Sequence, residues 1–135
     1  NIYNFEDLSE MGLEPCAYSM TFNVTDNRLN AILNQRSQDV LVANNWNVVQ
    51  YAVLVHMLAQ VCGYEAGELV HVIADAHIYD KHVPLVEELI GRTQYPAPKF
   101  EMNPDVKDFY EFTLDDFKLE NYQAGPQIKN IPVAE

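Results

Sequence analysis

The sequence predicts an α+β fold in which helices pack on a twisted mixed β-sheet. Apolar and polar residues alternate over residues 17–24 and again over 28–36, a pattern typical of half-buried strands. Residues 46–62 are instead apolar almost all round a helical wheel, and Gly63 follows as a stop signal, so we expect a buried helix there. A chain of 135 residues is long enough for a sizeable core, and we expect one domain spanning residues 1–135.

The first two strands are expected to pair as a hairpin, because Thr25-Asp26-Asn27 between them is turn-forming sequence. After the long helix, residues 67–79 (GELVHVIADAHIY) return to strand character.

The remaining elements are shorter. Residues 81–92 have the apolar spacing of a helix, with Pro84 in the first turn and Gly91 near the end. Short strands are expected near 97–102 and 117–122, followed by a C-terminal tail.

Composition narrows the classes of function. The net charge is −12 and the eight Lys and Arg residues form no block, so we expect no nucleic-acid partner. No apolar run reaches transmembrane length, so no membrane partner is expected. Two cysteines make no disulfide framework, which favours a reducing cytoplasm. The chain begins at Asn1 rather than Met, and we expect that something upstream has been removed.

The first candidate site residue is Cys16, which follows Pro15 just ahead of the first strand. A thiol acts as a nucleophile when a neighbouring group favours its thiolate form. Taken alone, the local sequence favours a small buried cysteine at position 16, and Cys62 within the apolar helix is read as structural.

A second candidate is the segment NQRSQD, residues 34–39. Arg36 offers a planar fork for a phosphate or carboxylate, Ser37 adds a hydroxyl donor, and Asp39 adds a carboxylate. The segment therefore fits an anion pocket at a strand end. A surface turn with an ordinary salt bridge is the alternative.

Further polar residues flank the long helix. Asn47 at its start fits a helix cap or first-turn residue, and its amide also fits the imide edge of a uracil ring. Asp75, His77 and Tyr79 share one face of the predicted strand, as does His71. No further ligand has convincing spacing for zinc, so we expect no metal. His77 and Tyr79 fit a pair of donors to a sugar hydroxyl, or simply satisfied polar residues of a half-buried strand.

The order of these motifs is more specific than any one of them. It runs from Pro15-Cys16 to Gln35-Arg36-Ser37-x-Asp39, Trp46-Asn47 with Tyr51-Ala52, Asp75-x-His77-x-Tyr79, and a Pro132-Val133-Ala134 tail. In this order, and in the helix sequence AVLVHMLAQVCGY, the chain resembles the catalytic-cysteine half of the thymidylate synthase family over about residues 15–134.

The resemblance implies a methyltransferase that converts dUMP to dTMP, with 5,10-methylenetetrahydrofolate as donor of carbon and hydride and no metal. Cys16 matches the nucleophile that adds to C6 of the uracil ring, after which C5 attacks the methylene group of the folate. Elimination and hydride transfer then give dTMP and dihydrofolate.

The same resemblance implies roles for the remaining candidates. Arg36 and Ser37 match residues that hold the dUMP phosphate, and the arginine is expected close to the thiol. Asn47 matches the reader of the uracil imide edge, and His77 and Tyr79 match donors to the deoxyribose hydroxyl. Asp39 matches a catalytic residue that bridges nucleotide and pterin. Gln35 and Gln38 are assigned to the nucleotide site, and Ala134 to a tail that closes over the folate.

Two alternatives stay open. One is a pyrimidine nucleotide 5-hydroxymethyltransferase of the same family, in which water captures the exocyclic methylene intermediate; the altered loop at residues 42–46 favours it. The other is a non-catalytic nucleotide-binding relative, favoured by Ala17, which stands where the family usually has His. Asn47 favours uracil over cytosine in either case.

The resemblance covers only the half of the family that carries the nucleophile. We therefore expect a piece of a longer chain, whose N-terminal half supplies the remaining phosphate and folate contacts. The family pairs sheet to sheet, so a symmetric homodimer is also expected.

Overall fold

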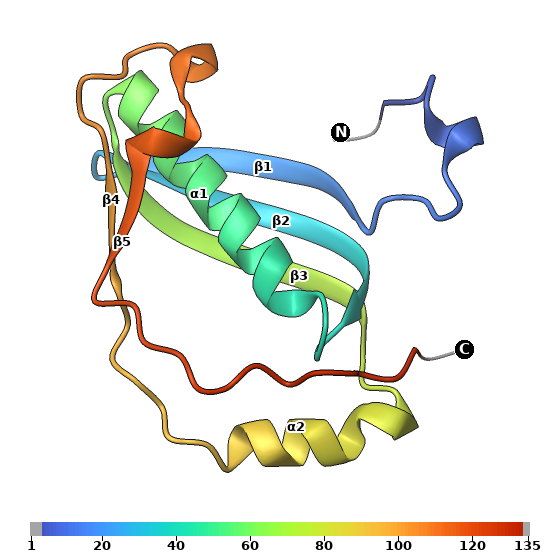
Figure 1. The fold of residues 1–135 in the computed structure, drawn as a ribbon. Coiled ribbons are helices and arrows are strands. Elements are labelled where there is room, and N and C mark those ends of the chain that lie inside the picture. Colours follow the sequence, from blue (N-terminus) through green and yellow to red (C-terminus); the bar gives the residue numbers. More distant parts are fainter. Residues whose placement is uncertain (1–3, 134–135) are drawn as a thin grey trace. The chain divides into compact units, whose positions relative to one another are not determined.

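The computed structural model describes residues 4–133 and divides the chain into two compact units, Asn1–His77 and Ile78–Glu135. The first unit consists of a three-stranded sheet and one long helix (Figure 1). Its elements are η1 (Leu8–Glu10, a 3-10 turn), β1 (Ala17–Thr25), β2 (Arg28–Asp39), α1 (Asn44–Cys62) and β3 (Glu65–His77).

The sheet has the order β1-β2-β3 and is mixed, because β1 runs antiparallel to β2 whereas β3 runs parallel to it. Parallel neighbours need a long crossover, and α1 provides it. This arrangement confirms the predicted α+β fold with a helix packed on a mixed sheet.

A two-residue turn closes the β1–β2 hairpin, as the sequence predicts. Asp26 and Asn27 both have positive φ, 49° and 63°, and Thr25 pairs with Arg28 across the turn. Two consecutive positive φ angles are the mark of the turn type that matches the twist of paired strands. Asp and Asn tolerate this left-handed conformation better than most other residues.

The parallel pair β2–β3 contains an irregularity near its start. The register shifts between Leu29 and Ala31, where the side chain of Asn30 accepts a hydrogen bond from the backbone N–H of Glu68 at 2.9 Å. Gly67 lies beside this contact, and a side chain there would collide with Asn30 and with the carbonyl oxygen of Leu29. A glycine is thus required for the two strands to approach here.

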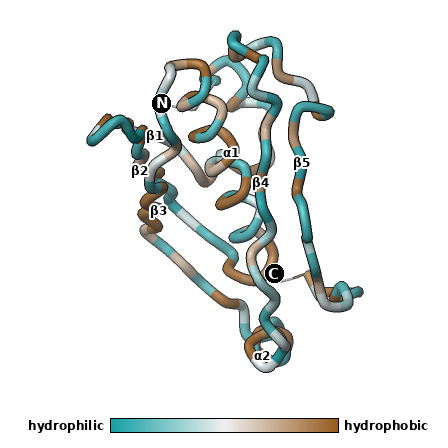
Figure 2. Tube along the Cα trace, turned by 90° about the vertical axis from the view of Figure 1, so that its left-hand side faces the viewer, coloured by the Kyte–Doolittle hydropathy of each residue, from teal (hydrophilic) through white to brown (hydrophobic). Residues whose placement is uncertain are grey.

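The core of the first unit lies between the sheet and α1, which covers one face (Figure 2). Leu33 in the central strand is fully buried and packs with Ala17 and Tyr51. Burial raises the pKa of the Tyr51 hydroxyl, because its charged form loses water. Met20, Leu54 and Leu69 pack around this cluster.

The opposite face of the sheet carries exposed apolar residues. Ile32, Val70 and Val72 are 43%, 47% and 49% exposed, and the register places Ile32 directly beside Val70. Asn34 lies on the same face and donates to the hydroxyl of Ser19 at 3.0 Å. We refer to Ile32, Val70 and Val72 as the outer sheet patch.

Helix α1 is less buried than its sequence predicts. Only Tyr51, Val55 and Ala59 are buried among its described side chains, while Trp46 is 79% exposed. The reason is that, within this unit, the sheet covers only the side of α1 that faces it. Its end is as expected: Gly63 has φ 75° and donates its N–H to the carbonyls of Ala59 and Gln60.

The second unit contains one helix and a two-stranded antiparallel sheet. The ring of Phe117 stacks on the rings of Phe100 and Phe112, with centroid distances of 6.2 Å and 5.5 Å, respectively. Its elements are η2 (Asp80–His82), α2 (Val83–Ile90), β4 (Lys99–Met102), η3 (Phe109–Glu111), η4 (Leu114–Asp116) and β5 (Phe117–Glu120).

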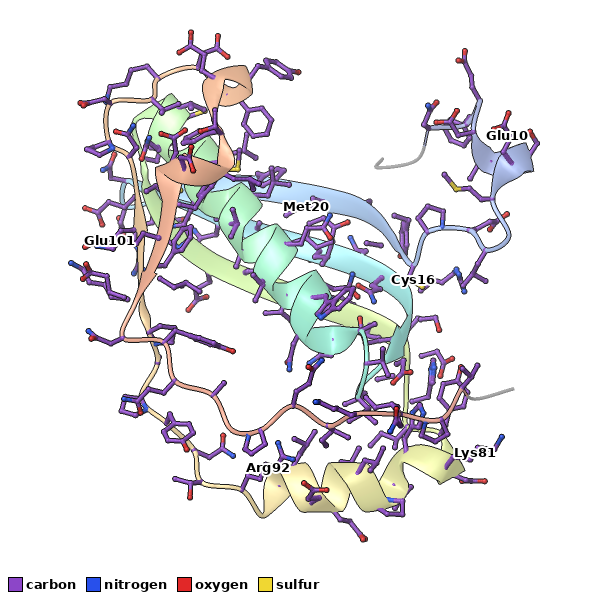
Figure 3. The ribbon with its side chains drawn as sticks, in the orientation of Figure 1. Glu10, Cys16, Met20, Lys81, Arg92 and Glu101 are labelled. Atoms are coloured by element: carbon purple, nitrogen blue, oxygen red, sulfur yellow. The ribbon has the colours of Figure 1, made fainter. Side chains whose placement is uncertain are left out.

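The C-terminal tail runs back along α2 (Figure 1). Arg92, labelled in Figure 3 just beyond the end of α2, donates to the carbonyl of Pro126 at 2.6 Å. At the start of the helix, the ring Nε2 of the buried His82 lies 2.8 Å from the carbonyl oxygen of Pro132. The two contacts fix the tail against the helix at both ends.

Several predicted boundaries need correction. The third strand of the sheet spans Glu65–His77 and not 67–79, so Tyr79 lies beyond it and does not share a strand face with His77. Strand β2 ends at Asp39, the partner of His77, so the ladder has no further residue to pair with. Strands β4 and β5 are also shorter than predicted, and the helix predicted at 81–92 is α-helical only over Val83–Ile90.

Candidate active site

Cys16 lies one residue before β1, at the end of the sheet where Figure 3 labels it. The backbone N–H of Arg36 donates to the carbonyl of Cys16 at 2.8 Å, which holds the thiol-bearing residue against β2. One guanidinium nitrogen of Arg36 donates to the carbonyl of Glu14 at 2.7 Å and lies 3.7 Å from the Cys16 sulfur. The predicted proximity of arginine and thiol is therefore confirmed.

Three neighbours of Arg36 on β2 form part of a buried polar network. Gln35 and Gln38 are 2% and 1% exposed, and their side-chain amides contact each other directly. The Gln35 amide nitrogen also donates to the backbone carbonyl of Ser37 at 2.8 Å. These contacts give the buried amide groups hydrogen-bond partners within the protein, as buried polar groups require.

Asp39 closes the segment between β2 and α1. One of its carboxylate oxygens accepts from the backbone N–H groups of Leu41 and Val42, at 3.0 and 3.1 Å. Its own carbonyl accepts from the N–H of Ala43 at 3.0 Å. Asp39 therefore shapes the loop that leads into the helix, a role that the sequence alone did not suggest.

Asn47 lies in the first turn of α1, and its backbone N–H donates to the carbonyl of Ala43 at 3.1 Å. Its side-chain oxygen accepts from the amide nitrogen of Gln35 at 3.3 Å. Asn47 is not the N-cap of the helix, because Ala43 holds that position without a side-chain bond. Its amide instead belongs to the polar network of β2.

His77 ends β3 directly beside Asp39, and its backbone carbonyl accepts from the N–H of Val40 at 3.0 Å. Its ring Nδ1 lies 3.3 Å from the carboxylate of Asp75. Tyr79 belongs to the second unit, where its ring meets His82 edge to face with centroids 5.5 Å apart. Ala134 lies outside the described residues.

The site residues of the first unit converge at one end of its sheet. The carboxyl ends of parallel β2 and β3, the start of β1 and the first turn of α1 meet there (Figure 1). Ligands of α/β sheets bind at the carboxyl ends of parallel strands, next to the helix that follows. The arrangement brings together Cys16, Gln35, Arg36, Ser37, Gln38, Asp39, Asn47 and His77.

This end of the sheet combines a nucleophile, a cation and fixed amides, which suits covalent chemistry on a polar, anionic substrate. Among residues 4–133, no three His, Cys, Asp or Glu side chains gather in a way that could hold a metal ion. Within the same range, no helix is long and apolar enough to cross a membrane.

The sequence places His71 on the same strand face as His77 but assigns it no role, and His71 is a further member of the network. The ring Nε2 of His71 lies 3.0 Å from the side-chain oxygen of Gln35. Burial lowers the pKa of His71 below its ordinary value, because the charged ring would lose water. The even spacing of His71, Asp75 and His77 on one strand face was the available signal.

The comparisons with known proteins agree with this geometry. The family model described as thymidylate synthase matches residues 1–134. The thymidylate synthase of Bacillus licheniformis is 44% identical over 127 residues, and that of Bacillus phage phi3T is 43% identical over the same length. Both alignments cover 94% of this chain and 46% of the relative.

A solved structure, the thermostable thymidylate synthase A from Bacillus subtilis, superimposes with a TM-score of 0.89 at 42% identity. The match covers 96% of this chain and 47% of that one, so the chain spans less than half the length of these relatives. Sequence, family model and fold agree over nearly the whole chain, which therefore belongs to the thymidylate synthase family.

Proposed function

We propose that this chain carries the nucleophile of an enzyme that methylates dUMP to dTMP. The observation that carries the proposal is the pairing of Cys16 with Arg36, 3.7 Å apart at the end of the sheet where the other site residues meet. A guanidinium beside a sulfur stabilises negative charge on it, and the thiolate is the attacking form.

In the proposed reaction, the sulfur of Cys16 forms a bond to C6 of the uracil ring. The C5–C6 double-bond electrons move to C5, which then attacks the methylene carbon of 5,10-methylenetetrahydrofolate as one of that carbon's two bonds to nitrogen breaks. After the proton at C5 is lost and the folate is eliminated, a hydride from the folate reduces the methylene group. Elimination of Cys16 releases dTMP and dihydrofolate.

The other site residues position the nucleotide in this proposal. Arg36 and Ser37 hold the phosphate, with Gln35 and Gln38 in the same nucleotide site. Asn47 reads the uracil edge, and His77 and Tyr79 donate to the deoxyribose hydroxyl. Asp39 bridges nucleotide and pterin, and its carboxylate already orders the loop beside the site.

Folate is proposed as the second substrate, and Ala134 as part of a tail that closes over it and excludes water. The carbonyl groups of Pro126 and Pro132 bind Arg92 and His82 at the two ends of α2, so the tail is held in place as far as residue 132. We further propose that the chain acts in the cytoplasm, as part of one domain that includes both compact units.

A symmetric homodimer is proposed through the outer sheet patch. Ile32, Val70 and Val72 are each more than two-fifths exposed on the sheet face opposite α1. Apolar side chains on a flat sheet face are stabilised when a second copy covers them, and a two-fold axis lets the same patch serve both partners.

A product assay tests the reaction. The longest chain that contains these 135 residues is incubated with dUMP and methylenetetrahydrofolate, and the nucleotide is read by mass. A methyl gain with dihydrofolate supports the proposal. A hydroxymethyl gain, with tetrahydrofolate left over, would replace it by hydroxymethyl transfer, which the altered loop at residues 42–46 favours. Measurable dUMP binding without product would indicate a non-catalytic nucleotide-binding relative.

A further inference from the structure

His82 is a buried histidine to which the proposed reaction assigns no role. It directly precedes α2 and is only 2% exposed. Its backbone N–H donates to the carbonyl of Tyr79 at 2.8 Å, and its ring meets the Tyr79 ring edge to face, with the ring planes 82° apart. The 3-10 turn before α2 therefore holds both the backbone and the ring of His82.

The ring of His82 contacts the C-terminal tail at Pro132. Its Nε2 lies 2.8 Å from the carbonyl oxygen of Pro132. A carbonyl oxygen can only accept, so Nε2 carries a hydrogen and donates it. Proline has no N–H, so this carbonyl is the only backbone group of residue 132 that can form a hydrogen bond. His82 binds that group.

The tail depends on contacts of this kind, because residues 122–133 belong to no helix or strand. Its second contact with α2 lies further back, where Arg92 donates to the carbonyl of Pro126. A chain extends at most about 3.6 Å per residue, so a residue two positions beyond an anchor stays within about 7 Å of it, whereas one eight positions beyond can move over about 29 Å. Ala134 is two positions beyond Pro132 and eight beyond Pro126.

From these contacts we propose that His82 is a positioning residue for the second substrate: its Nε2–H holds Pro132 so that the tail is in place to close over the folate. The inference rests on the proposed function, in which Ala134 belongs to that closing tail. Without this hydrogen bond the tail must be ordered at the moment of folate binding. The conformational entropy lost in that step weakens folate binding.

Two substitutions separate the hydrogen bond to the tail from the ring contact with Tyr79, which the proposed function assigns to the deoxyribose. His82→Phe keeps an aromatic ring beside Tyr79 but has no N–H to donate to Pro132. His82→Gln keeps an N–H donor but loses the ring. The first variant therefore isolates the contribution of the hydrogen bond, and the second restores it.

The test uses the longest chain that contains these residues. It measures the KM for methylenetetrahydrofolate at saturating dUMP and the dissociation constant of dUMP by calorimetry. We expect His82→Phe to raise the folate KM roughly tenfold, the effect of about one hydrogen bond, with dUMP affinity close to that of the wild type. His82→Gln is expected to restore most of the folate KM, because its amide can donate to the same carbonyl.

Arg92→Met is the matched control, because it removes the contact to Pro126 and leaves the one to Pro132 in place. Its folate KM is expected to stay close to that of the wild type. An unchanged folate KM in His82→Phe, or an equal loss of folate and dUMP affinity, would overturn the inference and leave the proposed function standing. A wild type that binds dUMP but forms no dTMP would overturn the proposed function and the inference with it.

A second measurement follows His82 in the wild type and does not depend on a variant that folds. Nitrogen-15 NMR distinguishes a protonated ring Nε2 from an unprotonated one, and we expect Nε2 to carry a hydrogen. A ring with its hydrogen on Nδ1 alone would contradict the donation to Pro132, whatever the kinetic constants are.

Discussion

Cys16 and Cys62 are the two cysteines of the chain, and their surroundings differ. Cys16 is half-buried beside a guanidinium, whereas Cys62 is exposed at the last residue of α1. A matched pair of serine substitutions therefore separates the chemistry of the site from the general effect of losing a thiol.

Cys16→Ser is expected to lower turnover by about a thousandfold or more, because the hydroxyl is a far weaker nucleophile. Binding of dUMP should change only a few-fold, since Arg36 and Asn47 remain. Cys62→Ser should match the wild type in both measurements. Steady-state kinetics and a binding titration check this, and unchanged turnover in Cys16→Ser would remove Cys16 from the mechanism.

His71 also makes stability depend on pH. Its pKa in the folded chain is lowered by burial from the ordinary value of 6.5, which the unfolded chain retains. As the pH falls through this value, His71 becomes protonated in the unfolded chain before it does so in the folded chain. The free energy of unfolding therefore decreases toward acidic pH. Urea titrations of wild type and His71→Gln should show the wild-type advantage shrinking below about pH 6.5; a constant difference would contradict the assignment.

At the scale of elements, Gly67 allows the close approach of β2 and β3. Gly67→Ala is expected to cost about 2 kcal/mol, because the new methyl group would press on Asn30 and lie 2.8 Å from the carbonyl oxygen of Leu29. Gly12→Ala is the control, since nothing lies within 4 Å of a methyl group there. Chemical denaturation compares the two, and equal stability of both variants would show that the strands separate without cost.

The elements that local sequence determines were predicted well. Asp26-Asn27, Gly63 and Pro84 each act on the backbone of their own segment, so the hairpin, the end of α1 and the place of Pro84 in the first turn of α2 could be predicted. The end of β3 depends instead on where its partner β2 stops, and for this reason the placement of Tyr79 on the strand was wrong.

The site residues likewise divide into those that the sequence indicates and those whose contacts depend on the packing of several elements. The family resemblance indicated Cys16 and Arg36, and the hairpin register explains why they meet. The contacts of Gln35 with His71 and Asn47 join β2, β3 and α1, and only the packed unit brings these together. The sequence places His71 on the correct strand face but does not indicate what it contacts.

At the scale of the whole molecule, the outer sheet patch is the surface through which we propose that two copies of the chain pair. Ile32 and Val70 lie side by side in the register, with Val72 two residues further along β3. The polar residues near them, Asn34 and Ser19, satisfy each other, so the patch can be covered without leaving these two groups unpaired.

Ile32→Glu is expected to dissociate the proposed homodimer, because a two-fold axis would bring two carboxylates into the same apolar contact. Ile90→Glu is the matched control: it introduces the same charge at an isoleucine that is 76% exposed on α2. Sedimentation velocity should show a dimer for the wild type and for Ile90→Glu, and a monomer for Ile32→Glu with unchanged helix content by circular dichroism. A wild type that sediments as a monomer over the accessible concentration range would contradict the sheet-to-sheet dimer, as would an Ile32→Glu variant that remains dimeric.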